Sequence, residues 1–420
     1  MATLTATNAN SLNNAVQAAA SGDVINVMNN ISLDGDGSGF QGTIAVPEIP
    51  GVANITIQSS GGPYTISSNT VNQRHFNNSG GLTLQNIVLD GGDSGGGVQV
   101  YSTARITDTY LGAGCVVQNC VTTNIGGAGV SILTADAINN GYNGSTANVT
   151  LDGCTIQNNH QRTPTVAGGG VWLSGQNVTA TMDNTNGETL IDGNTSQWSG
   201  GGIVVNSGSI LTINNGTISN NKAALHGGGI DTFNGALTTS PPATVIMNNA
   251  LILDNEAGAT VDGVTNPSSS PGGSGGGIAV EEYNNFTMNG GTIQGNTATL
   301  DGGGISTMLN ANLTINGTWT PSATLPAPPT SGEPCIAYNT AAVNGGGISM
   351  GTQSDGSPYL GAATPATATA TITKAAIFSN TAHADGGGLH ICNAAAATVN
   401  GSLIDGNIAD NNGGGYYITA

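Results

Sequence analysis

A triplet of glycines followed by an aliphatic residue recurs along the chain and constrains its fold more than any other feature. Counted from one aliphatic residue to the next, the shortest spacing is 27 residues, as from Ile203 to Ile230 and from Ile278 to Ile305. A fixed minimum period of this size is typical of solenoids, in which each repeat stacks on its neighbours. The triplets lie at residues 95–97, 168–170, 200–202, 227–229, 275–277, 302–304, 345–347, 386–388 and 413–415.

Two further elements accompany the glycines. An apolar residue is followed three positions later by Asn, as in Ile218 to Asn221, and the first Gly comes six residues after that Asn. A segment of alternating apolar residues and Thr, such as residues 211–213, ends in Asn or Asp. Each unit therefore holds three short strands separated by Gly and Asn turns, with no room for a crossover helix. This pattern predicts an all-β, right-handed parallel β-helix with three strands per coil and about eleven to thirteen coils.

The N-terminal residues predict a cap for this stack. Ser11 is expected to N-cap a short helix whose apolar stripe runs from Leu12 to Ala19 and which ends at Gly22. Such a helix would cover the first coil and block edge pairing. We expect one β-helix domain over residues 1–420, with the cap and first strands at 1–30, irregular first coils at 31–94 and glycine-repeat coils at 95–420.

Period-2 alternation orients the side chains of these strands. In the strand after the glycines, Ile230 and Thr232 are expected to point inward and Asp231 outward. The Asn residues of the apolar-x-x-Asn pattern should stack at one corner and hydrogen-bond to one another. We expect this ladder to be structural rather than catalytic. This predicted ladder comprises Asn194, Asn221, Asn296, Asn339, Asn380 and Asn407.

The outward threonines of the alternating segment should form one vertical row, with strands about 4.8 Å apart. A regular array of hydroxyls and amides is a candidate surface for binding glycans or ordered water, although Thr is also simply a good exposed strand residue. Ile246 interrupts the row. The candidate ligand-binding residues are Thr150, Thr181, Thr212, Thr287, Thr314 and Thr371.

The repeats resemble those of a known family. Residues 221–230 and 296–305, with Asn followed by an Ala two residues later and then by the glycines and Ile, resemble repeats of polymorphic outer-membrane proteins, which are autotransporter adhesins. The N-terminal helix and the segment from Gly22 to Ile25 look like the cap of right-handed β-helix proteins generally, including pectate lyases. The resemblance implies a surface β-helix. Ile replaces the family's Phe, and the C-terminal membrane barrel of autotransporters is not in this sequence.

Charge and hydropathy exclude several classes of partner. Five Lys and Arg stand against 24 Asp and Glu, for a net charge of −19, so we expect no nucleic-acid partner and no anionic membrane surface. No apolar run reaches about 18 residues, so no direct membrane insertion is expected. A weakly charged surface rich in Asn, Thr, Ser and Gly favours an extracellular or cell-surface location. No export signal is recognisable in these residues.

Catalysis and metal binding have weaker signals. Asp90, Asp93, Asp108 and Arg105 are the nearest candidates for polysaccharide cleavage, but they follow no motif of such enzymes, so no catalytic residue is assigned. No cofactor is predicted. The segment from Asp34 to Asp36 resembles half of a calcium loop, which leaves calcium open, yet its twelfth position is Ala45 rather than Glu.

Two cysteines occupy equivalent positions in successive repeats. Cys115 and Cys154 each stand two residues before an inward apolar residue, so adjacent coils would bring their Cα atoms within disulfide range. A disulfide and a pair of small reduced core residues are both compatible with this spacing.

The sequence favours a non-catalytic structural or adhesive role. The chain stops within residues 416–420, inside the strand that opens a new coil, so we expect that edge to pair with further repeats or with a second copy in a filament. Surface glycans and host or matrix proteins are the other expected partners. The alternative is a glycan-binding or polysaccharide-cleaving β-helix.

Overall fold

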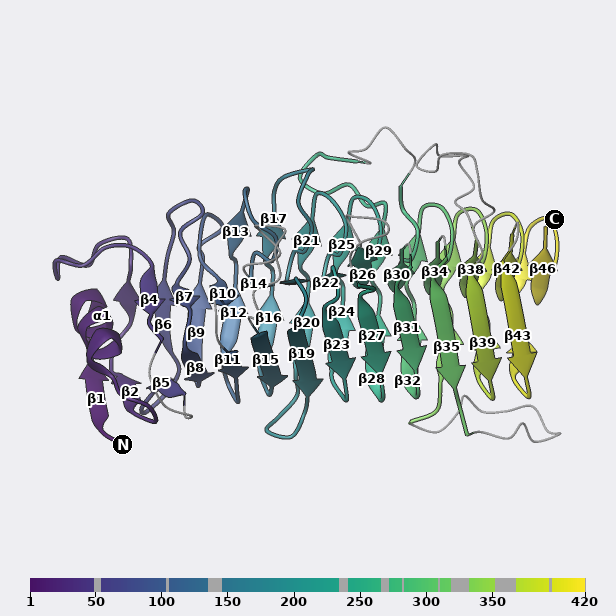
Figure 1. Ribbon diagram of the computed structural model, residues 1–420. Coiled ribbons are helices and arrows are strands. Elements are labelled where there is room, and N and C mark those ends of the chain that lie inside the picture. The colour runs from purple at the N-terminus through teal and green to yellow at the C-terminus, as the bar shows by residue number, and fades with distance from the viewer. Residues whose placement is uncertain are drawn as a thin grey trace.

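The chain forms a right-handed parallel β-helix, an elongated solenoid with the N- and C-terminal coils at opposite ends (Figure 1). The computed structural model describes residues 1–48, 54–102, 106–134, 146–233, 241–265, 272–281, 283–308, 310–318, 332–351, 368–392 and 395–419. Every pair of neighbouring strands in its sheets is parallel, as in Val149 beside Ala180. Successive strands of one sheet therefore come from successive coils.

Four sheets run along the solenoid, and we name them A to D. Sheet A contains β1 (Thr3–Ala6), β2 (Val24–Val27), β5 (Ile55–Ser59), β8 (Gly81–Gln85), β11 (Ile106–Leu111), β15 (Thr146–Asp152), β19 (Val178–Asp183), β23 (Ile210–Ile213), β27 (Thr244–Met247), β31 (Asn285–Met288), β35 (Asn312–Asn316), β39 (Thr369–Thr373) and β43 (Ala396–Asn400). Sheet B contains β3 (Ile31–Ser32), β6 (Tyr64–Ser67), β9 (Ile87–Asp90), β12 (Val116–Gln118), β16 (Thr155–Gln157), β20 (Leu190–Asp192), β24 (Thr217–Ser219), β28 (Ala250–Leu253), β32 (Gly291–Gln294), β36 (Cys335–Ala337), β40 (Ala376–Phe378) and β44 (Leu403–Asp405).

The other two sheets are C, whose strands come after the glycine triplets, and D, whose strands come after the Asn corner. Sheet C contains β4 (Ile44–Val46), β7 (Phe76–Asn78), β10 (Val98–Ser102), β14 (Val130–Thr134), β18 (Val171–Ser174), β22 (Ile203–Asn206), β26 (Ile230–Phe233), β30 (Ile278–Val280), β34 (Ile305–Thr307), β38 (Ile348–Met350), β42 (Leu389–Ile391) and β46 (Tyr416–Ile418). Sheet D contains β13 (Val121–Thr122), β17 (His160–Gln161), β21 (Thr195–Ser196), β25 (Lys222–Ala223), β29 (Glu256–Ala257), β33 (Thr297–Ala298), β37 (Thr340–Ala341), β41 (Thr381–Ala382) and β45 (Ile408–Ala409).

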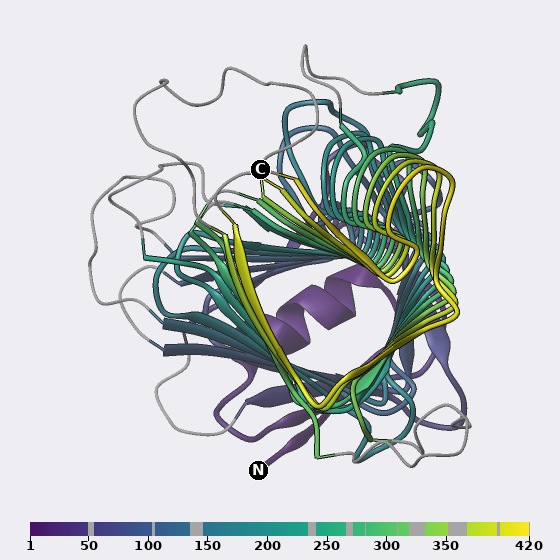
Figure 2. The same ribbon diagram turned by 90° about the vertical axis from the view of Figure 1, so that its right-hand side faces the viewer.

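Sheets A, B and C are the three strands per coil that the sequence predicts. Sheet D is an addition, because its strands have only two residues and carry too short a pattern to be recognised. In the end-on view, the D segments form a side lobe against the main barrel (Figure 2). Ala298 and Ala341 of sheet D are fully buried.

The N-terminal cap is a helix, α1 (Ala9–Ala18), which packs against β1, β2 and β4 and lies across the end of the barrel (Figure 2). Its N-cap is Asn8, whose side chain accepts a hydrogen bond from the Ser11 backbone. The sequence suggested Ser11 as the N-cap, and this is wrong. Ser11 is the third helical residue of a capping box that starts at Asn8. Leu12 and Val16 are fully buried against the first coils.

The glycine triplets exist because the chain passes very close to sheet D as it enters sheet C. Gly302 has a φ of +68°, which disfavours other residues. A Cβ on Gly303 would lie 2.5 Å from the backbone of Thr340 and from the carbonyl oxygen of Gly346. A Cβ on Gly304 would lie 3.0 Å from the Asn339 amide nitrogen. Each position of the triplet thus excludes a side chain for its own reason.

The glycine turn also covers the outer side of sheet C, which the sequence predicted to be exposed. Ile230 and Thr232 are buried as expected, but Asp231, on the opposite side of the strand, is also fully buried. The glycine turn lies over it, since a Cβ on Gly227 would be 2.6 Å from the Asp231 Cβ. Burial raises the pKa of Asp231 well above its ordinary value. Ser306 and His390, at equivalent positions, are buried in the same way.

Candidate functional site

The outer side of sheet A, which we call the A face, carries three columns of polar side chains along the solenoid axis. In the central column, Thr150 pairs in register with Thr181, and Thr181 with Thr212. After the interruption at Ile246, the column resumes at Thr287 and continues into the last coils. There, the register aligns Thr287, Thr314, Thr371 and Thr398. The structure thus places all six predicted threonines in one column, and their binding role remains a prediction.

A second column lies two residues further along each strand, and its side chains bond directly from coil to coil. The Asn214 amide donates to Asp183 at 3.4 Å, and the Asn248 amide donates to Asn214 at 2.9 Å. Asn289 and Asn316 continue the chain of bonds at 2.9 and 3.1 Å. These bonds fix the orientation of the amides while one side of the column stays open to solvent.

The third column lies two residues before the threonines. In its first part, the Asn148 amide donates to Asp108 at 2.8 Å, and the Thr179 hydroxyl donates to Asn148 at 2.7 Å. In later coils, Asn312 donates to Asn285 at 3.0 Å. Ile210, which is 40% exposed, interrupts this column between Thr179 and Thr244. The A face is therefore an array made mostly of hydroxyls and amides, with a few carboxylates.

A hollow of about 570 Å³ interrupts this flat surface near the N-terminal end. Tyr110 lies beside it, in the central column between Thr83 and Thr150. The Tyr110 hydroxyl donates to Asp152 at 2.9 Å, and the Asn186 amide donates to the Tyr110 oxygen at 2.9 Å. Burial and the bond to Asp152 raise the pKa of Tyr110. The hollow is lined by Met1, Gly22, Val24, Asn54, Thr56, Thr83, Asp108, Thr109, Tyr110, Asn148 and Thr150.

The predicted Asn ladder lies inside the solenoid, at the corner between sheets B and D. Asn296 illustrates its chemistry: its amide donates to Asn339 at 2.9 Å and to the Ile252 carbonyl at 3.0 Å. Its side-chain oxygen accepts both the backbone N–H and the amide of Asn255 at 2.9 Å. Each rung thus satisfies its buried polar groups through the next one. The hydrogen-bonded ladder comprises Asn159, Asn194, Asn221, Asn255, Asn296, Asn339, Asn380 and Asn407.

Two rungs do not show the six-residue offset to a glycine triplet. Asn255 lies 20 residues before Gly275, and Asn159 lies nine residues before Gly168. Both obey the apolar-x-x-Asn pattern, from Ile252 and Ile156, and that pattern alone would have found Asn159. In the coil before, Cys120 occupies the position, and its backbone N–H donates to the Asn159 side chain at 3.0 Å.

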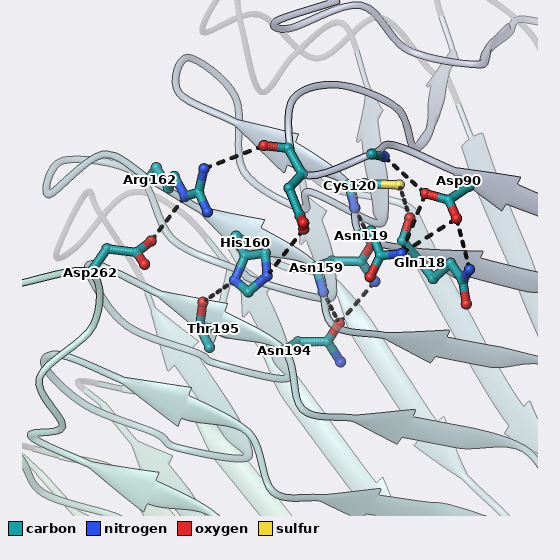
Figure 3. Close-up of polar contacts among 12 residues, drawn as sticks. Asp90, Gln118, Asn119, Cys120, Asn159, His160, Arg162, Asn194, Thr195 and Asp262 are labelled. Carbon is teal, nitrogen blue, oxygen red and sulfur yellow. Dashed lines mark hydrogen bonds and ion pairs between the residues drawn. The ribbon is translucent and has the colours of Figure 1, made fainter. Parts of the chain in front are cut away.

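The carboxylates considered for catalysis lie on different sides of the solenoid. Asp108 belongs to the A face, whereas Asp90 ends a strand of sheet B and accepts bonds from Gln118 and Asn119 (Figure 3). Asp93 lies 3.9 Å from the His160 ring. These three carboxylates form no pair across a common cleft. Arg105 lies outside the described residues.

Figure 3 also shows a cluster of charged groups beside sheet D. Arg162 forms an ion pair with Asp262 at 2.9 Å and donates to the Asp93 backbone at 3.4 Å. Burial and the nearby Arg162 lower the pKa of His160, against the opposing effects of Asp262 and Asp93. The cluster connects loops from separate coils, and its groups partner one another.

The calcium candidate has other partners in the structure. Asp36 accepts the Ala9 backbone N–H at the start of α1, at 2.6 Å. Asp34 accepts the Asn69 backbone N–H at 2.6 Å and the Thr70 hydroxyl at 2.7 Å. The two carboxylates thus bind two separate segments. Over the described ranges, His, Cys, Asp and Glu form no group of three placed to hold a metal ion.

Cys115 and Cys154 lie in adjacent coils inside the core, since Thr155 donates to the Cys115 carbonyl at 2.9 Å. Both are free thiols in the structure. Burial raises the pKa of both, that of Cys154 to about 12, so neither thiol ionises readily. The disulfide remains a prediction, which thiol counting on unfolded, unreduced protein would decide.

A comparison with known protein families agrees with this architecture. Residues 74–270 match the family model described as right handed beta helix region. No curated protein matches the chain. Among solved structures, the crystal structure of alginate lyase from Paenibacillus sp. str. FPU-7 aligns over 100% of this chain and 99% of that chain, at 13% identity and a TM-score of 0.29.

The family match and the sheet topology define the class of this molecule as a right-handed β-helix protein. Within the described ranges, no helix is both long and apolar enough to cross a membrane.

Proposed function

We propose that the chain is a non-catalytic β-helix of the cell surface or extracellular space that binds neutral polysaccharide along the A face. One observation carries the proposal: three parallel columns made mostly of hydroxyls and amides, interrupted at Ile210 and Ile246, extend over successive coils and stay at least partly accessible to solvent. A polysaccharide presents repeated hydroxyls in a row, so repeated donors and acceptors at a fixed spacing can engage many sugar units at once.

The charges of the chain favour an uncharged ligand. The net charge of −19 opposes acidic polysaccharides. Two of the five cations are engaged elsewhere, because Arg162 is paired with Asp262 and Lys222 with Glu256. Arg74 is buried and donates to backbone carbonyls such as that of Gly127. Lys374, directly after β39, is the one described cation at the end of an A-face strand. A face made mostly of amides and hydroxyls suits neutral glycans, and the hollow beside Tyr110 offers an anchoring point for one sugar.

A glycan array followed by calorimetric titration tests the proposal. We expect neutral polysaccharides to bind and the double variant Thr287→Val, Thr314→Val to bind at least tenfold more weakly, because valine keeps the strand shape but removes the hydroxyl. Thr297→Val on sheet D is the matched control and should bind as the parent chain does. Undiminished binding by the double variant, or no binding to any neutral glycan, would contradict the proposal. Release of new oligosaccharides would instead indicate cleavage.

A second candidate function is self-association, as a filament or as part of a longer surface solenoid. In the last described coil, Tyr416 and Ile418 are 61% and 60% exposed, whereas the residues paired with them, Leu389 and Ile391, are 2% and 8% exposed. Another coil stacked there would bury them in the same way. Light scattering over a concentration series should show growing assemblies that Ile418→Lys disperses. Assemblies that survive this substitution would contradict the assignment of this edge.

A further inference from the structure

The corner between sheets B and D holds one residue with left-handed backbone in each coil, and Tyr338 is an unusual occupant. Its φ is +55°. A bulky side chain is disfavoured in this conformation, whereas Gly and small polar residues tolerate it. The other coils follow that rule, with Asn119, Asn158, Gly193, Asn220, Asp254, Gly295, Ser379 and Gly406 at the same position. Strain that a fold retains on its surface is a reason to look for a function.

A second aromatic residue stands beside it. Phe378, from the next coil, forms an edge-to-face pair with Tyr338, with ring centroids 5.5 Å apart and an interplanar angle of 81°. Earlier coils place polar residues such as Gln118 and Gln157 in the column of Phe378. Leu253 and Ala337 are the apolar residues in that column, and neither carries a ring. Aromatic residues make up only 4% of the chain, so two adjacent rings at this corner are unexpected.

The rings are accessible, with hydroxyl and amide groups and one carboxylate near them. Tyr338 is 55% exposed, and Phe378 is partly exposed. Thr340 and Thr381 stand in register on the neighbouring strands of sheet D, and Gln294 lies one coil away on sheet B. Asp405 follows Phe378 in the next coil and adds negative charge. Exposed aromatic faces with a polar border suit a ligand that has an apolar face and peripheral hydroxyls.

We propose that Tyr338 and Phe378 form a stacking platform for a sugar ring of a neutral carbohydrate. The apolar C–H face of a pyranose packs on the exposed Tyr338 ring, against which Phe378 stands nearly perpendicular, while its hydroxyls reach the threonines and Gln294. Asp405 disfavours acidic sugars. The platform lies on a different side of the solenoid from the A face and does not depend on ligand binding there.

Substitution by the residue that other coils use provides the test. Tyr338→Asn should raise the unfolding midpoint, because Asn tolerates the left-handed backbone, and should weaken carbohydrate binding at the platform at least tenfold. Phe378→Gln, the residue found at Gln118 and Gln157, should also weaken binding. Tyr283→Asn is the control: Tyr283 has a φ of +61° and is 42% exposed, with no ring contact among the described residues. It should gain stability without a change in binding.

The measurement is saturation-transfer NMR and calorimetry with cellohexaose and mannohexaose, with choline chloride as a cationic probe. We expect two separable binding components. The A-face variant Thr287→Val, Thr314→Val weakens one component and leaves the transfer at the platform, whereas Tyr338→Asn and Phe378→Gln remove the platform transfer and leave the A-face component. Loss in the A-face variant but not in the platform variants would leave the A face as the site and overturn the platform. Absence of any neutral carbohydrate binding, or preferential binding of choline, would also overturn it.

Discussion

Asn289 and Asn296 belong to the same coil and differ mainly in where they lie. Asn296 is fully buried, and its side chain forms four hydrogen bonds with its neighbours above and below. Asn289 lies on the A face, where its side chain has two such bonds, to Asn248 and Asn316. In the coils from Asn214 to Asn316, the solenoid therefore stacks the same amide twice per coil, once in the core and once in water.

The difference shows how one side-chain chemistry serves two purposes. In the core, a polar group without a partner costs free energy, so the ladder is closed on itself and rigid. On the surface, water can replace any partner, and the remaining donors and acceptors stay available to a ligand. Stability is expected to depend on the inner ladder, and binding on the outer columns.

The largest expected effect comes from the glycines that close the corner around the inner ladder. Gly303→Ala would place a Cβ 2.5 Å from backbone atoms of the next coil, and we expect it to lower the free energy of unfolding by more than about 4 kcal/mol or to prevent folding. Gly263→Ala is the control, with a φ of +81° but no atom within 4 Å of the added Cβ, and should cost about 1 kcal/mol. Urea unfolding measures both. Equal effects would contradict the close approach to sheet D.

Removal of one rung is expected to come next. Asn296→Ala leaves the backbone N–H and amide of Asn255 and the carbonyl of Ile252 without their partner. We expect a loss of about 3 kcal/mol in urea unfolding because these groups stay buried. Asn296→Asp keeps the size but cannot donate to Asn339, so it should be no more stable than the alanine variant. A loss below about 1 kcal/mol would show that water enters the corner.

Buried histidines make the stability of the solenoid core depend on pH. Burial lowers the pKa of His75 and of His226 to about 4 from an ordinary value of 6.5. The unfolded chain therefore binds more protons than the folded one between these values, and stability is lost as the pH falls from about 6.5 to 4, by roughly 3 kcal/mol for each residue. The double variant His75→Gln, His226→Gln should show a shallower decline. Thermal melts at several pH values measure the difference, and identical slopes would contradict burial of these rings.

Much of this architecture was readable from the sequence because the repeat is strict. The period, the Thr column and most of the inner ladder follow from fixed offsets between Asn, Thr and the glycine triplets. Sheet D was missed because two residues cannot show an alternation. The burial of Asp231 was missed because it depends on a turn that folds back over the strand, which is a tertiary contact. The hollow at Tyr110 arises where an aromatic residue replaces Thr, a local exception that only the assembled face makes visible.

The most direct measurement is a paired comparison of Asn289→Ala with Asn296→Ala, in urea unfolding and in titration with a neutral oligosaccharide that the parent chain binds. The account predicts that Asn289→Ala changes the free energy of unfolding by less than about 0.5 kcal/mol but clearly weakens binding. Asn296→Ala should instead lose stability while its folded fraction still binds. If Asn289→Ala lost as much stability as Asn296→Ala, or bound the ligand unchanged, the division between a supporting inner ladder and a binding outer face would be wrong.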